Sequence, residues 1–200
     1  MEKLGIIGGT FDPIHLAHVY IAEVAKDSLN LDRVVFMVAG NPPHKTDKHI
    51  SDANIRYKMT KLAIIDKEGL EVSDYEIKEE GLSYTYRTLE YLNNTDRELY
   101  FITGADCLVN IESWRNVSEI LALCKFVVVT RPGIDNEKLI DQREYISKKY
   151  KSDIIFLEVA GKDMSSTEIR EKISKGEDVS QYLDTKVQKL IQDSNLYRGE

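Results

Sequence analysis

The sequence predicts an α/β fold in which a doubly wound parallel sheet carries helices on both faces. Strand-like and helix-like segments alternate from one end of the chain to the other, an order typical of parallel sheets. The strand-like segments are short apolar runs such as residues 126–129, which are too short to cross a membrane. Right-handed crossovers bring the loops that follow successive strands to one edge of such a sheet, where we expect ligands to bind.

The spacing of apolar residues predicts each element. Residues 53–65 carry apolar side chains at helical spacing, whereas residues 70–77 alternate as a strand does. The other expected strands cover residues 4–7, 33–39, 98–103, 126–130 and 154–159. One further helix is expected to begin near Pro13. The remaining expected helices cover residues 85–92, 117–123, 136–150, 165–174 and 186–193.

Length, charge and cysteine usage limit the class of protein. The 200 residues suit a single domain, which we expect over residues 1–200, with C-terminal helices at about 165–197 packed on its core. A net charge of −7 disfavours a nucleic-acid surface, although a few local cations can still hold a nucleotide. Cys107 and Cys124 are isolated, which indicates neither a disulfide framework nor a zinc site. Without a signal peptide or a membrane-length apolar run, we expect a cytoplasmic protein with no membrane partner. The sequence leaves the oligomeric state open, a homo-oligomer included.

The segment from Gly8 to His18, GGTFDPIHLAH, follows the first apolar run and leads into an amphipathic stretch. Gly8 and Gly9 let backbone N–H groups approach a phosphate closely. His15 and His18 are three residues apart, so they fall on one face of the expected helix, near the positive end of its dipole. Together with the Thr10 hydroxyl and the helix N-terminus, these groups predict a polyphosphate site. The alternative is a plain glycine turn with two surface histidines.

Two further polar segments follow expected strands. In Asn41–Lys45 (NPPHK), two prolines stiffen a loop that projects Lys45 as a point charge for a phosphate; taken alone, NPPHK also fits a surface loop. In SYT, Ser83 stands in the position of a helix N-cap. The same helix start offers backbone amides near Thr85 to a carboxylate.

The segment FITGAD and the only tryptophan form the next candidate. Gly104 follows a strand and allows close approach of a ligand, and Asp106 can accept hydrogen bonds from ribose hydroxyls. Trp114 has two interpretations. It is either an anchor of the core, because a lone tryptophan is usually well buried, or a flat surface for an electron-poor ring.

The last candidates follow the fifth and sixth strands. Arg131 opens the first of these loops, and Ser165-Ser166-Thr167 begin the helix after the second. Arg170 lies one turn further along, so the helix start predicts a second anion site, suited to the outer phosphates of a triphosphate. Ser165 and Glu168 also fit an ordinary capping box.

These segments together resemble the (H/T)xGH nucleotidyltransferases, in particular the bacterial nicotinate mononucleotide adenylyltransferases, over nearly the whole chain. Members of that family join ATP to nicotinate mononucleotide and release pyrophosphate, which gives deamido-NAD. Three residues depart from the family pattern. Ala17 replaces a glycine, Arg87 replaces a frequent aspartate, and Arg115 replaces an aromatic residue after Trp114. The Arg115 backbone amide survives this change, but side-chain stacking on the pyridine ring does not.

The resemblance implies a place for each substrate. ATP is expected to contact Gly8, Gly9, Thr10, Phe11, Arg131, Ser165, Ser166 and Thr167. Nicotinate mononucleotide is expected to contact Asn41, Lys45, Thr85, Gly104, Asp106, Trp114 and Arg115. The expected catalytic residues are His15, His18, Lys45 and Arg170: His18 at the α-phosphate, His15 and Arg170 at the outer phosphates, and Lys45 at the incoming phosphate. We expect Mg²⁺ to arrive with ATP, because no carboxylate cluster offers a metal site on the protein.

Three other functions fit parts of this pattern. A sister transferase of the same fold would use nicotinamide mononucleotide or phosphopantetheine as its acceptor. A dehydrogenase would need G-x-G-x-x-G and an acidic residue about twenty positions on, and GGTFDP does not match that motif. A nucleotide sensor would bind ATP without releasing pyrophosphate.

Overall fold

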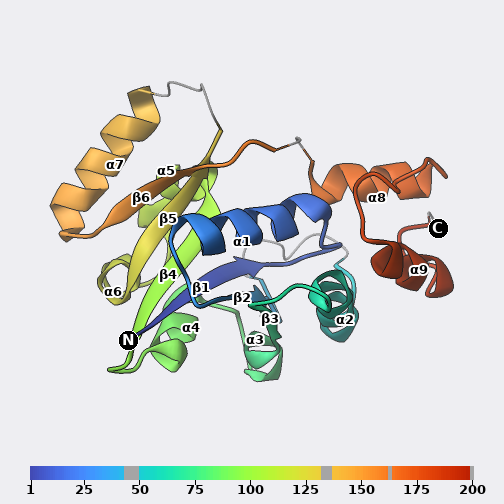
Figure 1. Ribbon diagram of the computed structural model, residues 1–200, viewed down its shortest axis with the longest axis horizontal. Coiled ribbons are helices and arrows are strands. Elements are labelled where there is room, and N and C mark those ends of the chain that lie inside the picture. The colour runs from blue at the N-terminus through green and yellow to red at the C-terminus, as the bar shows by residue number, and fades with distance from the viewer. Residues whose placement is uncertain (43–49, 132–136, 162–163, 199–200) are drawn as a thin grey trace.

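Six parallel strands form one sheet in the order β3-β2-β1-β4-β5-β6 (Figure 1). The computed structural model describes residues 1–42, 50–131, 137–161 and 164–198. The strands are β1 Glu2–Gly9, β2 Arg33–Val38, β3 Leu70–Ser73, β4 Arg97–Gly104, β5 Cys124–Thr130 and β6 Ile154–Glu158. The chain winds outward from β1 to β3 and then restarts on the other side of β1 with β4. This reversal between β1 and β4 confirms the predicted doubly wound sheet.

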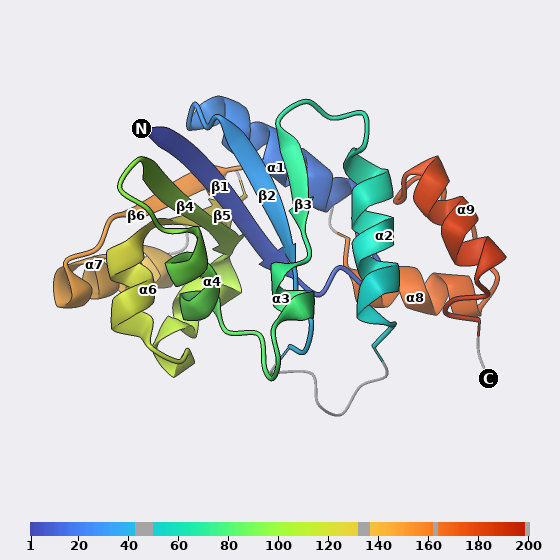
Figure 2. The same cartoon turned by 90° about the horizontal axis from the view of Figure 1, so that it is seen from below.

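Helices cover both faces of the sheet, as Figure 2 shows. They are α1 Leu16–Ser28, α2 Ala53–Ile64, α3 Tyr75–Lys78, α4 Thr85–Leu92, α5 Ala105–Val109, α6 Val117–Leu123, α7 Glu137–Tyr150, α8 Ser166–Ser174 and α9 Thr185–Asp193, with a short 3₁₀ turn at Ile111–Ser113. No helix within these described ranges is both long and apolar enough to cross a lipid bilayer.

The core consists of two apolar clusters, one on each face of the sheet. Along β2, Val34 and Phe36 belong to the first cluster, with residues of α1, α2, α8 and α9, whereas Val35 and Met37 belong to the second, with residues of α4 to α7. Successive side chains of a strand point to opposite faces. A central strand covered on both sides therefore needs a continuous apolar run, which is why these segments were recognisable in the sequence.

The expected strand over residues 70–77 is only half right. β3 pairs with β2 from Leu70 to Ser73 and then stops. The Ser73 hydroxyl accepts a hydrogen bond from the Tyr75 amide at 3.2 Å, and the chain turns into the single-turn helix α3. A local hydrogen bond to the serine side chain thus takes the place of further backbone pairing with β2. Serine side chains often bond to nearby backbone in this way at turns. Apolar alternation at Tyr75 and Ile77 was consistent with a strand, but they pack from the helix instead.

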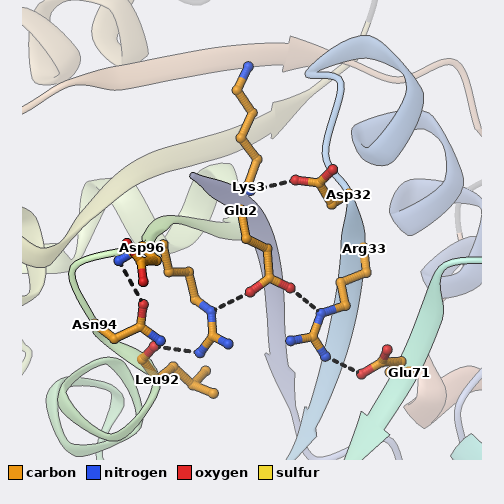
Figure 3. Close-up of polar contacts among 9 residues, drawn as sticks. Glu2, Lys3, Asp32, Arg33, Glu71, Leu92, Asn94 and Asp96 are labelled. Atoms are coloured by element: carbon orange, nitrogen blue, oxygen red, sulfur yellow. Dashed lines mark hydrogen bonds and ion pairs between the residues drawn. The ribbon is translucent and has the colours of Figure 1, made fainter.

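Ion pairs join the amino ends of four strands, on the side of the sheet where β1 begins (Figure 3). Glu2 accepts hydrogen bonds from Arg33 Nε at 2.5 Å and from Arg97 Nε at 2.7 Å, and Arg33 Nη1 donates to Glu71 at 2.5 Å. Arg97 also donates to the Leu92 carbonyl at 2.7 Å. The hydrogen bonds from Arg33 and Arg97 lower the pKa of Glu2. We call Glu2, Arg33, Glu71 and Arg97 the amino-end network.

Candidate active site

The loop between β1 and α1 folds tightly over the end of the sheet. Phe11 adopts a positive φ of 50° and buries its ring against Phe36, with ring centroids 5.6 Å apart. A side chain at Gly9 would lie 2.8 Å from that ring, so only glycine fits there. The ring of Phe11 also meets His18 edge-on at 5.2 Å. Through Phe11, the loop backbone is therefore held close to His18 at the start of α1.

His15 and His18 lie together at the start of α1. His15 is the N-cap, and the two imidazole rings stack with centroids 3.6 Å apart, which confirms that they share one face. The His15 backbone amide donates to His18 Nδ1 at 3.3 Å. Because Nδ1 of His18 accepts this bond, the proton of its neutral ring belongs on Nε2, where it can be donated to a ligand.

His15 is only 5% exposed, and this burial lowers its pKa to about 4. At neutral pH the ring is therefore uncharged and acts as one hydrogen-bond donor and one acceptor. Its Nδ1 has no hydrogen-bond partner among the residues that the structure describes. A buried polar atom without a partner is costly, so a ligand that bonded to it would remove that cost.

The start of α8 packs directly on this loop. Ser165 and Glu168 form the capping box, with Ser165 Oγ accepting from the Glu168 amide at 3.1 Å and Glu168 accepting from the Ser165 amide at 2.9 Å. Ser166 Oγ donates to the Pro13 carbonyl at 2.9 Å. Both serine hydroxyls are thus engaged within the protein. The contribution of this segment to an anion site would come from the backbone amides that begin the helix.

Arg170 reaches back from α8 to the same loop. One guanidinium nitrogen donates to the Asp12 carbonyl at 2.7 Å, and another donates to Thr167 Oγ1 at 3.2 Å. The side chain is half-buried. Its position is therefore fixed by the protein, with further N–H groups left to reach a ligand, since a guanidinium carries five.

These groups line a cavity of about 890 Å³ at the carboxyl ends of β1, β4 and β5. A cavity of this size can hold a nucleotide-sized ligand. The predicted site residues that line it are Gly8, Gly9, Thr10, Phe11, His15, His18, Gly104, Asp106, Arg131, Ser165, Ser166, Thr167 and Arg170. The predicted residue Lys45 lies outside the described residues. The predicted residues that meet in this one cavity include pairs more than 160 positions apart in the sequence, such as Gly8 and Arg170.

Four predicted residues lie in a second group, which we call the acceptor cluster: Asn41, Thr85, Trp114 and Arg115. They are not among the residues that line the cavity. The Ser83 amide donates to the Asn41 carbonyl at 2.9 Å, and the Arg115 guanidinium lies 5.0 Å from the ring centroid of Tyr84, the residue before Thr85. The cluster thus joins three segments that are distant in the sequence.

Trp114 packs on the core at a steep angle to two phenylalanine rings. Its ring centroid lies 6.0 Å from that of Phe101 and 6.2 Å from that of Phe126, and the side chain is half-buried. This packing agrees with the core-anchor interpretation, while the exposed part of the indole is left for stacking. The ring of Phe101 also lies 3.5 Å from where a side chain on Gly8 would begin. Phe101 therefore stands between the cavity and the acceptor cluster.

A half-buried carboxylate, that of Glu76, lies beside the acceptor cluster. Thr88 Oγ1 donates to Glu76 Oε1 at 2.5 Å, and burial raises the pKa of Glu76. Ser83 Oγ accepts from the amides of Gly40 and Asn41 at 3.0 and 3.2 Å. The interpretation of Ser83 as an N-cap is therefore wrong. Tyr84 is the N-cap of α4, and Ser83 instead holds the chain that leaves β2.

Within the described residues, no group of three or more histidine, cysteine, aspartate and glutamate side chains could hold a metal ion. One carboxylate at the cavity, Asp12, already accepts from the Ser51 amide at 3.1 Å and from the Tyr197 hydroxyl. The other, Asp106, is exposed in the first turn of α5. A metal ion here would need most of its ligands from elsewhere.

Known proteins resemble this chain in sequence and in fold. A family model described as cytidylyltransferase-like matches residues 6–172. The chain is 53% identical to a protein named "Probable nicotinate-nucleotide adenylyltransferase" from Clostridium botulinum strain Eklund 17B, over 100% of both chains. It is also 53% identical to the protein of that name from Clostridium novyi, over 99% of this chain and 100% of the relative. Among solved structures, Plasmodium falciparum nicotinic acid mononucleotide adenylyltransferase complexed with NaAD superposes with a TM-score of 0.79, at 19% identity and over 98% of each chain.

Proposed function

Because this chain belongs to the cytidylyltransferase-like family and, within it, to the nicotinate-nucleotide adenylyltransferases, we infer that it transfers the adenylyl group of ATP to nicotinate mononucleotide. The products are nicotinate adenine dinucleotide (deamido-NAD) and pyrophosphate, and the reaction belongs to NAD biosynthesis. The observation that carries this function is the cavity in which stacked histidines, glycine amides, the start of α8 and Arg170 converge. Such a set of donors suits a triphosphate.

The reaction needs positioning more than acid–base chemistry. The phosphate oxygen of the mononucleotide is already anionic at neutral pH, so it can attack the α-phosphorus without a general base. The new P–O bond forms as the bond to the β-phosphate oxygen breaks, and pyrophosphate leaves with the electron pair. Catalysis then consists of holding the two reactants in line and stabilising the developing charge.

We assign the donors to the phosphates by their place in the cavity. His18 Nε2–H would donate to the α-phosphate, which is supported by the hydrogen bond that occupies His18 Nδ1. The α8 backbone amides and Arg170 would hold the outer phosphates, together with neutral His15. Asp106 would accept from ribose hydroxyls. Lys45 at the incoming phosphate stays a prediction from the sequence.

We propose that Mg²⁺ enters with ATP and is held mainly by phosphate oxygens. Support comes from the carboxylates at the cavity, because Asp12 has both oxygens engaged and Asp106 alone is exposed. When bound, the ion would neutralise charge on the β- and γ-phosphates. We also propose a cytoplasmic location, which is supported by two free cysteines, Cys107 and Cys124.

An acceptor panel tests the function directly. Pyrophosphate release is measured with ATP and, in turn, nicotinate mononucleotide, nicotinamide mononucleotide and phosphopantetheine. We expect the highest kcat/KM with nicotinate mononucleotide. A higher value with either other acceptor would assign the protein to a sister transferase. ATP binding without pyrophosphate release from any acceptor would contradict an enzymatic function.

A further inference from the structure

Arg56 is a charged side chain in an unusual place. It lies in the first turn of α2, is only 1% exposed, and is the largest fully buried side chain among the described residues. Arginine is almost never buried completely unless its donors are satisfied. It does not line the cavity. Arg56 is not among the predicted site residues, because a lone arginine in a helix is normally exposed to solvent.

The Arg56 guanidinium is satisfied by four backbone carbonyls. Its Nη1 donates to Thr10 at 2.8 Å and to Ala39 at 2.7 Å, its Nη2 donates to Gly40 at 3.2 Å, and its Nε donates to Ser51 at 2.9 Å. Thr10 belongs to the loop after β1, and the others belong to the segments after β2 and before α2. One rigid, planar group therefore fixes three segments relative to each other.

The backbone segments that Arg56 holds together extend to both the cavity and the acceptor cluster. Thr10 lines the cavity. Gly40, on the other side of the guanidinium, donates its amide to Ser83 Oγ at 3.0 Å, and Ser83 leads into the acceptor cluster. A side chain on Gly40 would meet the Glu76 carbonyl at 2.2 Å, so this contact is tight. Arg56 thus lies on the path of direct contacts between the expected ATP loop and the expected acceptor loops.

Asp12 connects the segments around Arg56 to the C-terminal part of the chain. Its carboxylate is 3% exposed and accepts from the Ser51 amide at 3.1 Å and from the Tyr197 hydroxyl. Its backbone carbonyl accepts from Arg170 at 2.7 Å. Attraction to Asp12 opposes the lowering of the Arg56 pKa by burial. Tyr197, like Arg56, does not line the cavity, and its hydroxyl donates to Asp12, which does line it.

We propose that Arg56 and Tyr197 are positioning residues for adenylyl transfer, which hold the ATP loop at Thr10–Asp12 in register with the acceptor loops. The proposal rests on the proposed function. In-line attack requires the two reacting atoms to be aligned at near-contact distance, and a misplacement of about 1 Å can cost about 100-fold in rate. Ligand affinity is less sensitive, because each substrate keeps its own contacts.

Two variants test the proposal with readouts that a purely structural role would not move. Arg56→Lys keeps the charge but cannot reach four carbonyls, and Tyr197→Phe removes only the hydroxyl that bonds to Asp12. We measure kcat per folded molecule at saturating ATP and nicotinate mononucleotide, and separately the Kd of ATP by calorimetry. We expect kcat to fall about 10- to 100-fold for Arg56→Lys and about 3- to 10-fold for Tyr197→Phe, with the Kd of ATP within about 3-fold of the parent.

Matched controls come from the far side of the sheet. Arg143→Lys changes an exposed arginine over the Phe156 ring, and Tyr145→Phe removes a hydroxyl that accepts from Lys149 at 2.9 Å. Both should keep the parental kcat. If Arg56→Lys fails to fold, the kcat of Tyr197→Phe per folded molecule decides whether the proposal holds. Variants that melt earlier yet keep the parental kcat per folded molecule overturn the proposal, as does a loss confined to the Kd of ATP.

The outcome also separates this proposal from the function on which it rests. An inactive parent with every acceptor overturns the proposed function, and this proposal with it. An active parent together with fully active variants overturns only the positioning role.

Discussion

At the amino ends of the strands, Glu2 accepts hydrogen bonds from Arg33 and Arg97, and each charge faces an opposite one. At the carboxyl ends, glycine amides, stacked histidines and the start of α8 surround a cavity of about 890 Å³. Polar groups at the first end are satisfied within the protein. At the second end, His15 Nδ1 has no hydrogen-bond partner among the described residues.

The difference separates stability from function within one sheet. Paired surface charges stabilise the fold by at most about 1 kcal/mol each, and they offer little to a ligand. Donors that converge on a cavity stabilise the free protein little, and they gain energy when an anion arrives. Substitutions at the two ends should therefore have opposite signatures, with rate affected at one end and melting temperature at the other.

The largest effect is expected at the carboxyl end, from His18→Ala. Loss of one donor to the developing charge should lower kcat and kcat/KM together by about 100- to 1,000-fold. The fold should persist, because His18 is only partly buried. Steady-state pyrophosphate release and thermal melting measure the two quantities. Turnover within about twofold of the parent, below ~0.5 kcal/mol in activation free energy, would show that His18 is not the α-phosphate donor.

Acceptor choice should give the next largest effect. The two pyridine mononucleotides differ only in a carboxylate against a carboxamide, and backbone amides near Thr85 and Arg115 would hold the carboxylate. A carboxamide NH₂ would leave those donors unmatched at roughly 1–3 kcal/mol each, so two contacts give a preference on the order of 100-fold. Because Trp114 is the only tryptophan, its fluorescence during titration reports on this cluster alone.

Each half of that titration can fail separately. Equal affinity for the two mononucleotides would contradict the carboxylate assignment. An acceptor that binds without any change in fluorescence would leave Trp114 as an anchor of the core, in keeping with its edge contacts to Phe101 and Phe126.

The loop from Gly8 to His18 could be predicted because its determinants are local. The glycines, the histidine pair and the start of the following helix lie within eleven residues of sequence. The doubly wound order was likewise predictable, since it follows from alternating elements and right-handed crossovers. The individual contacts of the acceptor cluster were less accessible. Ser83 was assigned to its own helix, but it bonds to Gly40 and Asn41 across the fold.

The two polar networks could not be predicted, for a shared physical reason. Glu2 and Arg97 meet only because β1 and β4 pair in one register, and nothing local in the sequence sets that register. Arg56 looks like any exposed helical arginine until the carbonyls of Thr10 and Ala39 are brought around it. A charged residue three positions before buried Met59, on the apolar face of α2, was the one available signal.

Arg170→Lys should weaken use of ATP by a smaller amount. Lysine keeps the charge but cannot bond to Asp12 and Thr167 and still present a fork to phosphate. Loss of one charged hydrogen bond, at roughly 1.5–3 kcal/mol, predicts at least about a 10-fold higher KM for ATP. Lys172→Ala is the matched control on the same helix, since Lys172 pairs with exposed Glu177. If the two variants have the same KM for ATP, Arg170 does not bind the triphosphate.

The smallest effect is expected at the amino end, from Glu2→Gln. An amide replaces a carboxylate that accepts from two arginines, so we expect a loss of about 1 kcal/mol in unfolding free energy and a fall of about 2–4 °C in melting temperature. Turnover should match the parent. Glu177→Gln, at a single exposed pair, should change neither quantity.

The pH dependence of that loss identifies its cause. The pKa of Glu2 is lower in the folded protein, so its stabilisation is complete above the unfolded pKa of about 4.5 and is lost as pH falls through the folded value. The gap between the parent and Glu2→Gln should therefore close in acid and stay open at neutral pH. A gap that persists unchanged at low pH would attribute the loss to packing. A fall in turnover at neutral pH would contradict the separation between the two ends of the sheet.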